Sequence, residues 1–123
     1  MKVAFESPIK TGQSLPITCS WILIELQNTI LYTVTLYVRN PKEEKQAMST
    51  FVIDSLAVDT LPEKGYESRF QVLLQEDYSR NVTIALTYVT EEDVGVYSCD
   101  LRVADITYSS QPEMLDVLSK NKL

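Results

Sequence analysis

Few residues of this chain have side chains suited to covalent or metal chemistry. The sequence contains no histidine and only two cysteines, Cys19 and Cys99, among its 123 residues. The lack of histidine excludes Ser–His and Cys–His nucleophilic catalysis and histidine metal ligands, and two cysteines are too few for a structural zinc cage. Carboxylates alone remain as acid–base groups. We therefore expect a protein that is not an enzyme and that binds no metal and no cofactor.

The two cysteines are best suited to form a disulfide. Each stands in the middle of a predicted strand and shares its face with an apolar neighbour, Ile17 for Cys19 and Leu101 for Cys99. Inward-facing cysteines on separate strands can bridge two sheets. Closing a loop of 80 residues would stabilise the fold by about 4 kcal/mol in the chain-entropy model. The alternative is a pair of reduced core cysteines in a cytosolic protein.

The second cysteine closes the pattern D-x-G-x-Y-x-C, which runs from Asp93 to Cys99. Tyr97 lies on the same strand face as Cys99, so its ring should be buried and its hydroxyl needs a backbone partner, an arrangement called a tyrosine corner. Gly95 is expected to let the chain pass from a tight turn into the strand. Asp93 should lie at the rim of the sheet and favour a nearby cation, and Arg69 begins the strand expected beside it.

Apolar residues alternate with polar ones along most of the chain, and turn residues separate the alternating stretches, which predicts strands. The predicted strands are 3–8, 15–19, 30–39, 46–53, 67–74, 81–89, 95–103 and 113–118. The segment 54–66 holds at most a short strand, and 104–112 is expected to be a loop. Short strands without a helix predict an all-β fold, an antiparallel β-sandwich. We expect a single domain over 1–118, with 119–123 as the start of a linker.

The charge balance excludes several kinds of partner. Seventeen acidic against eleven basic residues give a formal charge of −6. Nucleic acid and anionic lipid surfaces favour basic patches, so neither is an expected partner. No apolar run approaches the ~18 residues of a membrane span. The acidity is expected to keep the domain soluble.

These features resemble the immunoglobulin superfamily and, within it, the variable-type domain, over essentially the whole chain. The matching segments are Gly12 to Cys19, Arg69-Phe70-Gln71-Val72, the alternating Val82, Ile84, Leu86 and Val89, and the D-x-G-x-Y-x-C pattern. The resemblance implies an immunoglobulin-like β-sandwich of about nine strands, because the long cysteine spacing leaves room for the extra C′ and C″ strands. It also implies a salt bridge between Arg69 and Asp93.

Two features depart from the pattern of antigen-receptor variable domains. Relatives carry a tryptophan on strand C, where this chain has Leu36, with Val34 as the alternative for that place. The single tryptophan, Trp21, lies two residues after Cys19 and is expected either to fill the space near the disulfide or to cap one end of the sandwich. The last strand lacks the F-G-x-G bulge that pairs two receptor domains, so antibody-like pairing is not expected.

The resemblance implies two candidate binding surfaces, the outer face of the G-F-C-C′ sheet and the loops at one end. Strand parity puts on that face Thr35, Tyr37 and Arg39 of strand C, Ser98, Asp100 and Arg102 of strand F, and part of Met48, Thr50 and Val52 of strand C′. Tyrosine and arginine beside a carboxylate are typical of protein interfaces. The candidate partner-binding residues are Tyr37, Arg39, Asp100 and Arg102 on the face and Ile106 and Tyr108 in the loop 104–112.

Each of these candidates has a plainer alternative. The face residues could be ordinary solvated side chains, and Ile106 and Tyr108 could pack back against the sheet. The apolar stretch 22–26 either continues strand B or forms an apolar patch. The charged turn 42–45 is expected to be solvated.

The triplet Asn81-Val82-Thr83 is an N-glycosylation sequon, and Asn81 should face solvent because Val82 points inward. Together with a disulfide it favours an extracellular protein, secreted or anchored to the membrane by a segment outside this sequence. We expect a non-catalytic recognition domain of a cell-surface receptor or adhesion protein, whose partner is a second copy or another protein. The alternative is an immunoglobulin domain of a secreted innate-immune recognition protein, acting as an interaction module or as a spacer for an effector or lectin domain.

Overall fold

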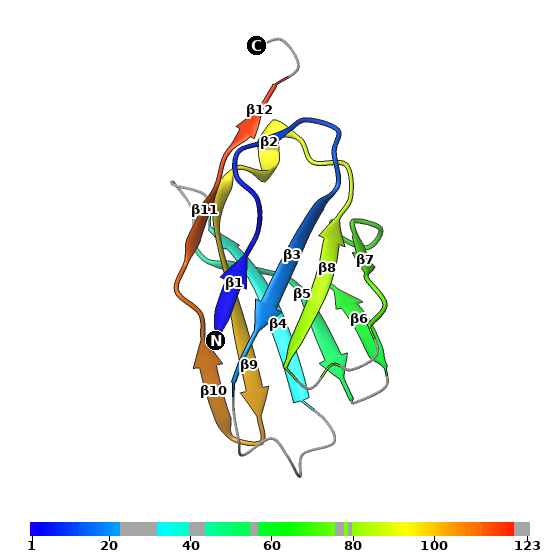
Figure 1. Cartoon of the computed structure of the whole chain (residues 1–123), viewed down its shortest axis with the longest axis vertical. Coiled ribbons are helices and arrows are strands. Elements are labelled where there is room, and N and C mark those ends of the chain that lie inside the picture. Colours follow the sequence, from blue (N-terminus) through cyan, green and yellow to red (C-terminus); the bar gives the residue numbers. More distant parts are fainter. Residues whose placement is uncertain (23–31, 40–43, 55–56, 76–77, 79, 120–123) are drawn as a thin grey trace.

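The computed structural model describes residues 1–22, 32–39, 44–54, 57–75, 78 and 80–119, which form two β-sheets packed face to face (Figure 1). The smaller sheet has the order β1-β3-β8-β7, with bounds Lys2–Ala4, Leu15–Ser20, Asn81–Leu86 and Phe70–Val72. The larger sheet has the order β10-β9-β4-β5-β6, with bounds Ile106–Ser109, Gly95–Val103, Tyr32–Arg39, Gln46–Ile53 and Val58–Pro62. β11 (Glu113–Leu115) also pairs with β9, whereas β2 (Ile9–Lys10) and β12 (Val117–Leu118) form a separate parallel pair.

This architecture confirms the predicted fold class, an all-β, immunoglobulin-like antiparallel sandwich. Every pairing within the two main sheets is antiparallel. In the part of the chain that the structure describes, the helical element is one 3-10 turn, η2 (Glu91–Asp93), at the predicted acidic turn. No helix there has the length and hydropathy needed to cross a membrane.

Several predicted strands are shorter or divided in the structure. The strand expected over 3–8 is confined to β1, which pairs with β3, and a second short strand that was not predicted, β2, follows and pairs with β12. Pro8 lies between them and has no N–H to donate to a strand ladder. The strand expected over 67–74 is confined to β7. The prediction of a loop over 104–112 is wrong for its first half, because residues there form β10, which pairs with β9.

The core lies between the sheets, and alternate residues of the long strands point into it. In β4, Val34 and Leu36 are fully buried, whereas Thr33 and Thr35 between them are half-buried. Burying such an aliphatic side chain stabilises a fold by about 1.5–3 kcal/mol. The alternation of the sequence is therefore what fixes which side of each strand faces the other sheet. The largest fully buried side chains are those of Tyr97, Phe51, Leu15, Ile17, Leu36 and Met48.

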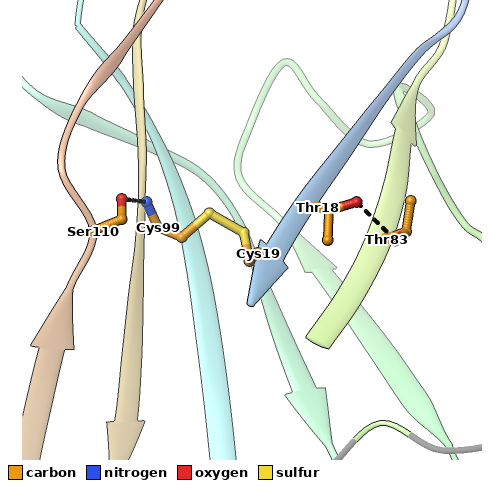
Figure 2. Close-up of a disulfide and its surroundings, with 5 residues drawn as sticks. All are labelled: Thr18, Cys19, Thr83, Cys99 and Ser110. Carbon is orange, nitrogen blue, oxygen red and sulfur yellow. Dashed lines mark hydrogen bonds between the residues drawn. A yellow bond between two sulfur atoms is a disulfide. The ribbon is translucent and has the colours of Figure 1, made fainter. Parts of the chain in front are cut away.

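The disulfide between Cys19 and Cys99 joins the two sheets through the middle of the core (Figure 2). Cys19 belongs to β3 and Cys99 to β9, their Cα atoms are 6.1 Å apart, and both are fully buried. The predicted bridge is thus confirmed. Leu36 is the register partner of Cys99, so it lies beside the disulfide, where immunoglobulin domains carry a buried tryptophan.

Trp21 fills the core toward the end of the sandwich. It is 3% exposed and packs edge-on against Tyr32, with 5.5 Å between ring centroids. Tyr32 begins β4, four residues before Leu36. Trp21 is therefore a core residue in contact with the start of β4.

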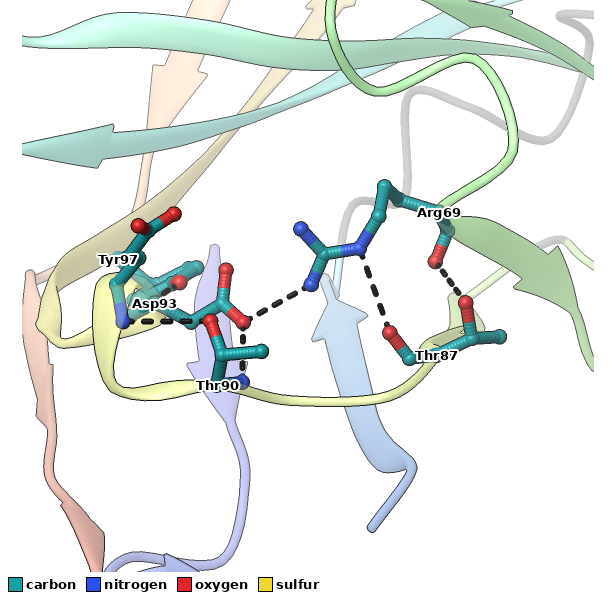
Figure 3. Close-up of polar contacts among 6 residues, drawn as sticks. Arg69, Thr87, Thr90, Asp93 and Tyr97 are labelled. Atoms are coloured by element: carbon teal, nitrogen blue, oxygen red, sulfur yellow. Dashed lines mark hydrogen bonds and ion pairs between the residues drawn. The ribbon is translucent and has the colours of Figure 1, made fainter. Parts of the chain in front are cut away.

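The tyrosine corner joins η2 to β9 and β7 (Figure 3). The Tyr97 hydroxyl donates to the backbone carbonyl of Asp93 at 2.6 Å, and burial raises the pKa of Tyr97 far above its ordinary value. The Asp93 carboxylate pairs with the Arg69 guanidinium at 2.9 Å, the predicted salt bridge, and accepts from the Thr90 N–H at 2.8 Å. These contacts fix the turn that leads into β9.

Gly95 is required for close packing and not for an unusual backbone angle. Gly12 and Gly65 have positive φ, and Gly95 does not. A Cβ at Gly95 would lie 3.0 Å from the carbonyl oxygen of Arg39 and 3.0 Å from a Val38 methyl. The chain does pass from the turn η2 into β9 at Gly95, as predicted, but no positive φ requires a glycine there. Gly95 lets the start of β9 approach the end of β4 closely.

Candidate functional site

The outer face of the larger sheet brings together the polar residues that strand parity predicted there. Thr33 and Thr35 of β4 are half-buried, and their register partners on β9 are Arg102 and Asp100. Further along, Tyr37 faces Ser98. On β10, Thr107 and Ser109 are the partners of Arg102 and Asp100 and extend the face. The outward placement of Tyr37, Arg39, Asp100 and Arg102 agrees with the sequence prediction.

A β-bulge changes the contribution of β5 to this face. The register between β4 and β5 shifts between Leu36 and Tyr37, so Met48 and Ser49 are both buried in succession. The prediction that Met48 is partly on the outer face is wrong, because the extra residue of the bulge turns it into the core. Thr50 is outward, with its hydroxyl 3.1 Å from that of Thr35.

A charged cluster lies on the face where β4, β9 and the start of β5 meet. The Lys45 ammonium lies 4.2 Å from the centre of the Tyr37 ring and 3.6 Å from a carboxylate oxygen of Asp100. Lys45 is therefore more than the solvated turn residue that the sequence predicts. Its contact with Tyr37 combines a cation with an aromatic face. The register set by the bulge brings Lys45 here, and no pattern in the sequence indicates it.

One carboxylate oxygen of Asp100 accepts no hydrogen bond from a residue that the structure describes. Its side chain is 17% exposed, and its Oδ2 faces Lys45. Its Oδ1 is buried and has no hydrogen-bond partner among the described residues. Buried acceptors without a partner are uncommon because they cost free energy.

A hollow of about 180 Å³ opens on the same face beside this cluster. Its lining residues are Arg39, Lys45, Val96, Ser98, Ser110 and Pro112. Val96 shares the parity of Ser98 and could have been found by extending that pattern. Ser110 and Pro112 could not, because they lie in a predicted loop.

The hollow exists where the last strand is interrupted. β10 ends with Ser109 opposite Asp100, and β11 begins with Glu113 opposite Tyr97, so one extra residue is accommodated between them. Ser110 there accepts from the Cys99 N–H through its hydroxyl at 2.9 Å (Figure 2). The side chain replaces a missing backbone ladder contact and keeps the interrupted strand attached to β9.

The candidates predicted in the loop 104–112 lie on a strand. β9 and β10 form a tight hairpin in which Ile106 pairs with Val103, and Ala104 in the turn has a φ of 53°. Tyr108 is opposite Leu101 and packs against the core, which agrees with the alternative that it packs back against the sheet and not with a place on a loop tip. Ile106 is 55% exposed, at the end of the sheet. The long end loop expected for binding is therefore replaced by a two-residue turn.

The structure describes only part of the other two end loops that were candidates for binding. Residues 23–26 of the predicted apolar stretch and 55–56 lie outside the described residues, and Ile22 is 91% exposed. Arg102 is exposed, and its Nε donates to the carbonyl of Ala104 at 3.4 Å. Within the described ranges, no group of three or more His, Cys, Asp or Glu side chains is placed to hold a metal ion.

The predicted glycosylation site lies on the other sheet. Asn81 begins β8, and the next residue, Val82, is fully buried, so Asn81 is directed away from the core. The Thr83 hydroxyl of the sequon lies 2.9 Å from that of Thr18 (Figure 2). A glycan on Asn81 would cover the smaller sheet and leave the outer face of the larger sheet open.

Comparison with known proteins adds no family to this description. A scan against protein-family models finds no match, and a search of curated proteins finds no match either. The structural grounds for an immunoglobulin-like domain are therefore the paired sheets, the buried disulfide and the tyrosine corner. The grounds for a function are the chemical properties of the outer face of the larger sheet.

Proposed function

We propose that this chain is a variable-type immunoglobulin domain of an extracellular recognition protein, and that it binds a protein partner without catalysis. The variable type is supported by the order of the larger sheet, in which β5 and β6 follow β4 before the chain crosses to β7. A buried disulfide favours an oxidising compartment. The partner is either a second copy of the chain or another protein.

The binding surface in this proposal is the outer face of β9, β4 and β5. The observation that carries it is the cluster of Tyr37, Lys45 and Asp100, which includes a buried carboxylate oxygen without a partner among the described residues. Tyrosine and arginine are enriched at interface centres, and this face presents Tyr37 together with the exposed Arg39. The neighbouring hollow makes this patch partly concave, whereas the face of a sheet is otherwise nearly flat.

The two sheets offer a matched pair of variants for the test. Thr50 is hydrogen-bonded to Thr35 on the outer face of the larger sheet, and Thr18 is hydrogen-bonded to Thr83 on the outer face of the smaller sheet. Both are half-buried threonines on paired strands. Thr50→Arg and Thr18→Arg therefore introduce the same bulk and charge on opposite faces of one folded domain.

The experiment measures binding of the oxidised, tetramerised domain to individually expressed cell-surface proteins, with the chain itself included among them. Thr50→Arg should weaken partner binding by more than about tenfold, equivalent to about 1.4 kcal/mol. Thr18→Arg should leave it within about twofold. Binding that Thr18→Arg abolishes and Thr50→Arg leaves intact would show that the other face is used. Sedimentation equilibrium separates self-association from a foreign partner.

A further inference from the structure

The hollow on the outer face presents hydrogen-bond donors that the described chain does not use. The Arg39 guanidinium carries five N–H donors, and it makes no ion pair or hydrogen bond with a residue that the structure describes. Ser98 adds a hydroxyl. Ser110 is only 8% exposed, and because its oxygen already accepts from the Cys99 N–H, its own O–H is left to donate.

The charges around the hollow favour one small anionic group. Asp100, the carboxylate of this face, is already paired with Lys45 at 3.6 Å, which leaves Arg39 as the cation without a described partner. Arginine favours carboxylates and phosphates because its N–H donors form a planar fork. The chain's formal charge of −6 opposes a polyanion such as nucleic acid or a phosphorylated surface.

The rest of the lining distinguishes a carboxylate from a phosphate. Val96 and Pro112 form an apolar part of the wall. A carboxylate at the end of a short aliphatic chain can place its methylene groups there, whereas a phosphate group has no apolar part to place. The volume of about 180 Å³ leaves room for one acidic side chain.

We infer that the hollow receives a glutamate or aspartate side chain of the protein partner, held by Arg39 and by the hydroxyls of Ser98 and Ser110. This inference deepens the proposed function and rests on it. The partner segment that binds here therefore carries an acidic side chain.

The test uses a blocked glutamate residue as probe, because it presents the carboxylate without the rest of a partner. N-acetyl-glutamate methylamide is titrated into the ¹⁵N-labelled, oxidised domain, with the glutamine analogue and inorganic phosphate as matched probes. We expect saturable shifts of the backbone amides of Val96, Ser98 and Ser110 with the glutamate probe, at a Kd of about 1–10 mM. The glutamine analogue should give no saturable shift.

Variants of two exposed arginines on the same face complete the test. Arg39→Gln should weaken glutamate binding by about tenfold, whereas Arg102→Gln should leave it within about twofold, because Arg102 does not line the hollow. A dispersed spectrum shows that each variant is folded. Equal shifts with glutamine, equal affinity for phosphate, no saturable shift, or an unchanged Kd in Arg39→Gln would each overturn the carboxylate assignment.

Failure of this assignment is distinguishable from failure of the proposed function. Partner binding that is sensitive to Thr50→Arg but insensitive to Arg39→Gln would retain the binding face and reject the hollow as a carboxylate site. Glutamate binding by the isolated domain without any Thr50→Arg effect on a partner would retain the site and reject the face as the main interface.

Discussion

Replacement of Asp93 by alanine tests the polar contacts that fix the turn leading into β9. The Asp93 carboxylate is 7% exposed, and one oxygen accepts from both the Arg69 guanidinium and the Thr90 N–H. The substitution removes both contacts and leaves two donors without their acceptor. It leaves the tyrosine corner in place, because Tyr97 donates to the backbone carbonyl of residue 93 and not to its side chain.

The size of the effect follows from the exposure of each partner. The Thr90 N–H loses its acceptor in a partly buried turn, which costs about 1–2 kcal/mol. A charge-assisted bond to a carboxylate is worth about 1.5–3 kcal/mol, and the Arg69 side chain, at 28% exposed, can turn partly to water, so the lower value applies. The sum is a loss of about 3 kcal/mol from a total stability of about 5–15 kcal/mol.

Urea unfolding of the oxidised protein, followed by fluorescence of the single and buried Trp21, measures this loss. With a slope of about 1.5 kcal/mol per molar urea, the midpoint should fall by about 2 M. The exposed Asp59 on β6 is the control, and Asp59→Ala should stay within about 0.5 kcal/mol of the wild type. A loss below about 1 kcal/mol for Asp93→Ala would refute the reasoning that this carboxylate fixes the turn.

Two further predictions concern the same end of β9. Because burial raises the pKa of Tyr97 in the folded chain, the unfolded chain alone loses this proton above its ordinary pKa of about 10, and stability should fall as the pH rises beyond that value. Between neutral pH and about pH 11, the wild type should lose about 1.4 kcal/mol more unfolding free energy than the Tyr97→Phe variant, as measured by urea unfolding of both proteins. Equal losses in the two proteins would contradict this role of Tyr97. Gly95→Ala should lower the thermal unfolding midpoint, at a cost of about 1–3 kcal/mol, because its methyl group meets the Arg39 carbonyl oxygen at 3.0 Å; an unchanged midpoint would show that the strands can separate without penalty.

The parts of the fold that the sequence predicts well depend on local pattern. Alternation in β4 and β9 correctly assigns which residues face the core, because each strand buries one side whatever its neighbours are. The D-x-G-x-Y-x-C pattern predicts the corner, since its spacing puts Tyr97 and Cys99 on one face, whereas the salt bridge to Arg69 was implied by the resemblance to immunoglobulin domains. Even Gly95 is correctly singled out, although for a reason that only the approach of β4 reveals.

The parts that the sequence does not predict depend on register between strands. Met48 is buried because one extra residue is absorbed in the pairing of β5 with β4, and nothing in the residues 46–53 marks that bulge. The hairpin of β9 and β10 turns at Ala104, which has positive φ and is not a residue type that signals such a turn. Tyr108 consequently faces the core, although its place in a predicted loop suggested exposure.

The candidate site contains residues placed by local pattern and residues placed by strand register, and the sequence predicts only the first kind. Tyr37, Arg39 and Asp100 follow from strand parity, but their chemical meaning depends on Lys45 and Ser110, which only register places beside them. Lys45 pairs with Asp100, and Arg39 makes no ion pair with a residue that the structure describes, so the Arg39 guanidinium is available for the carboxylate of a partner.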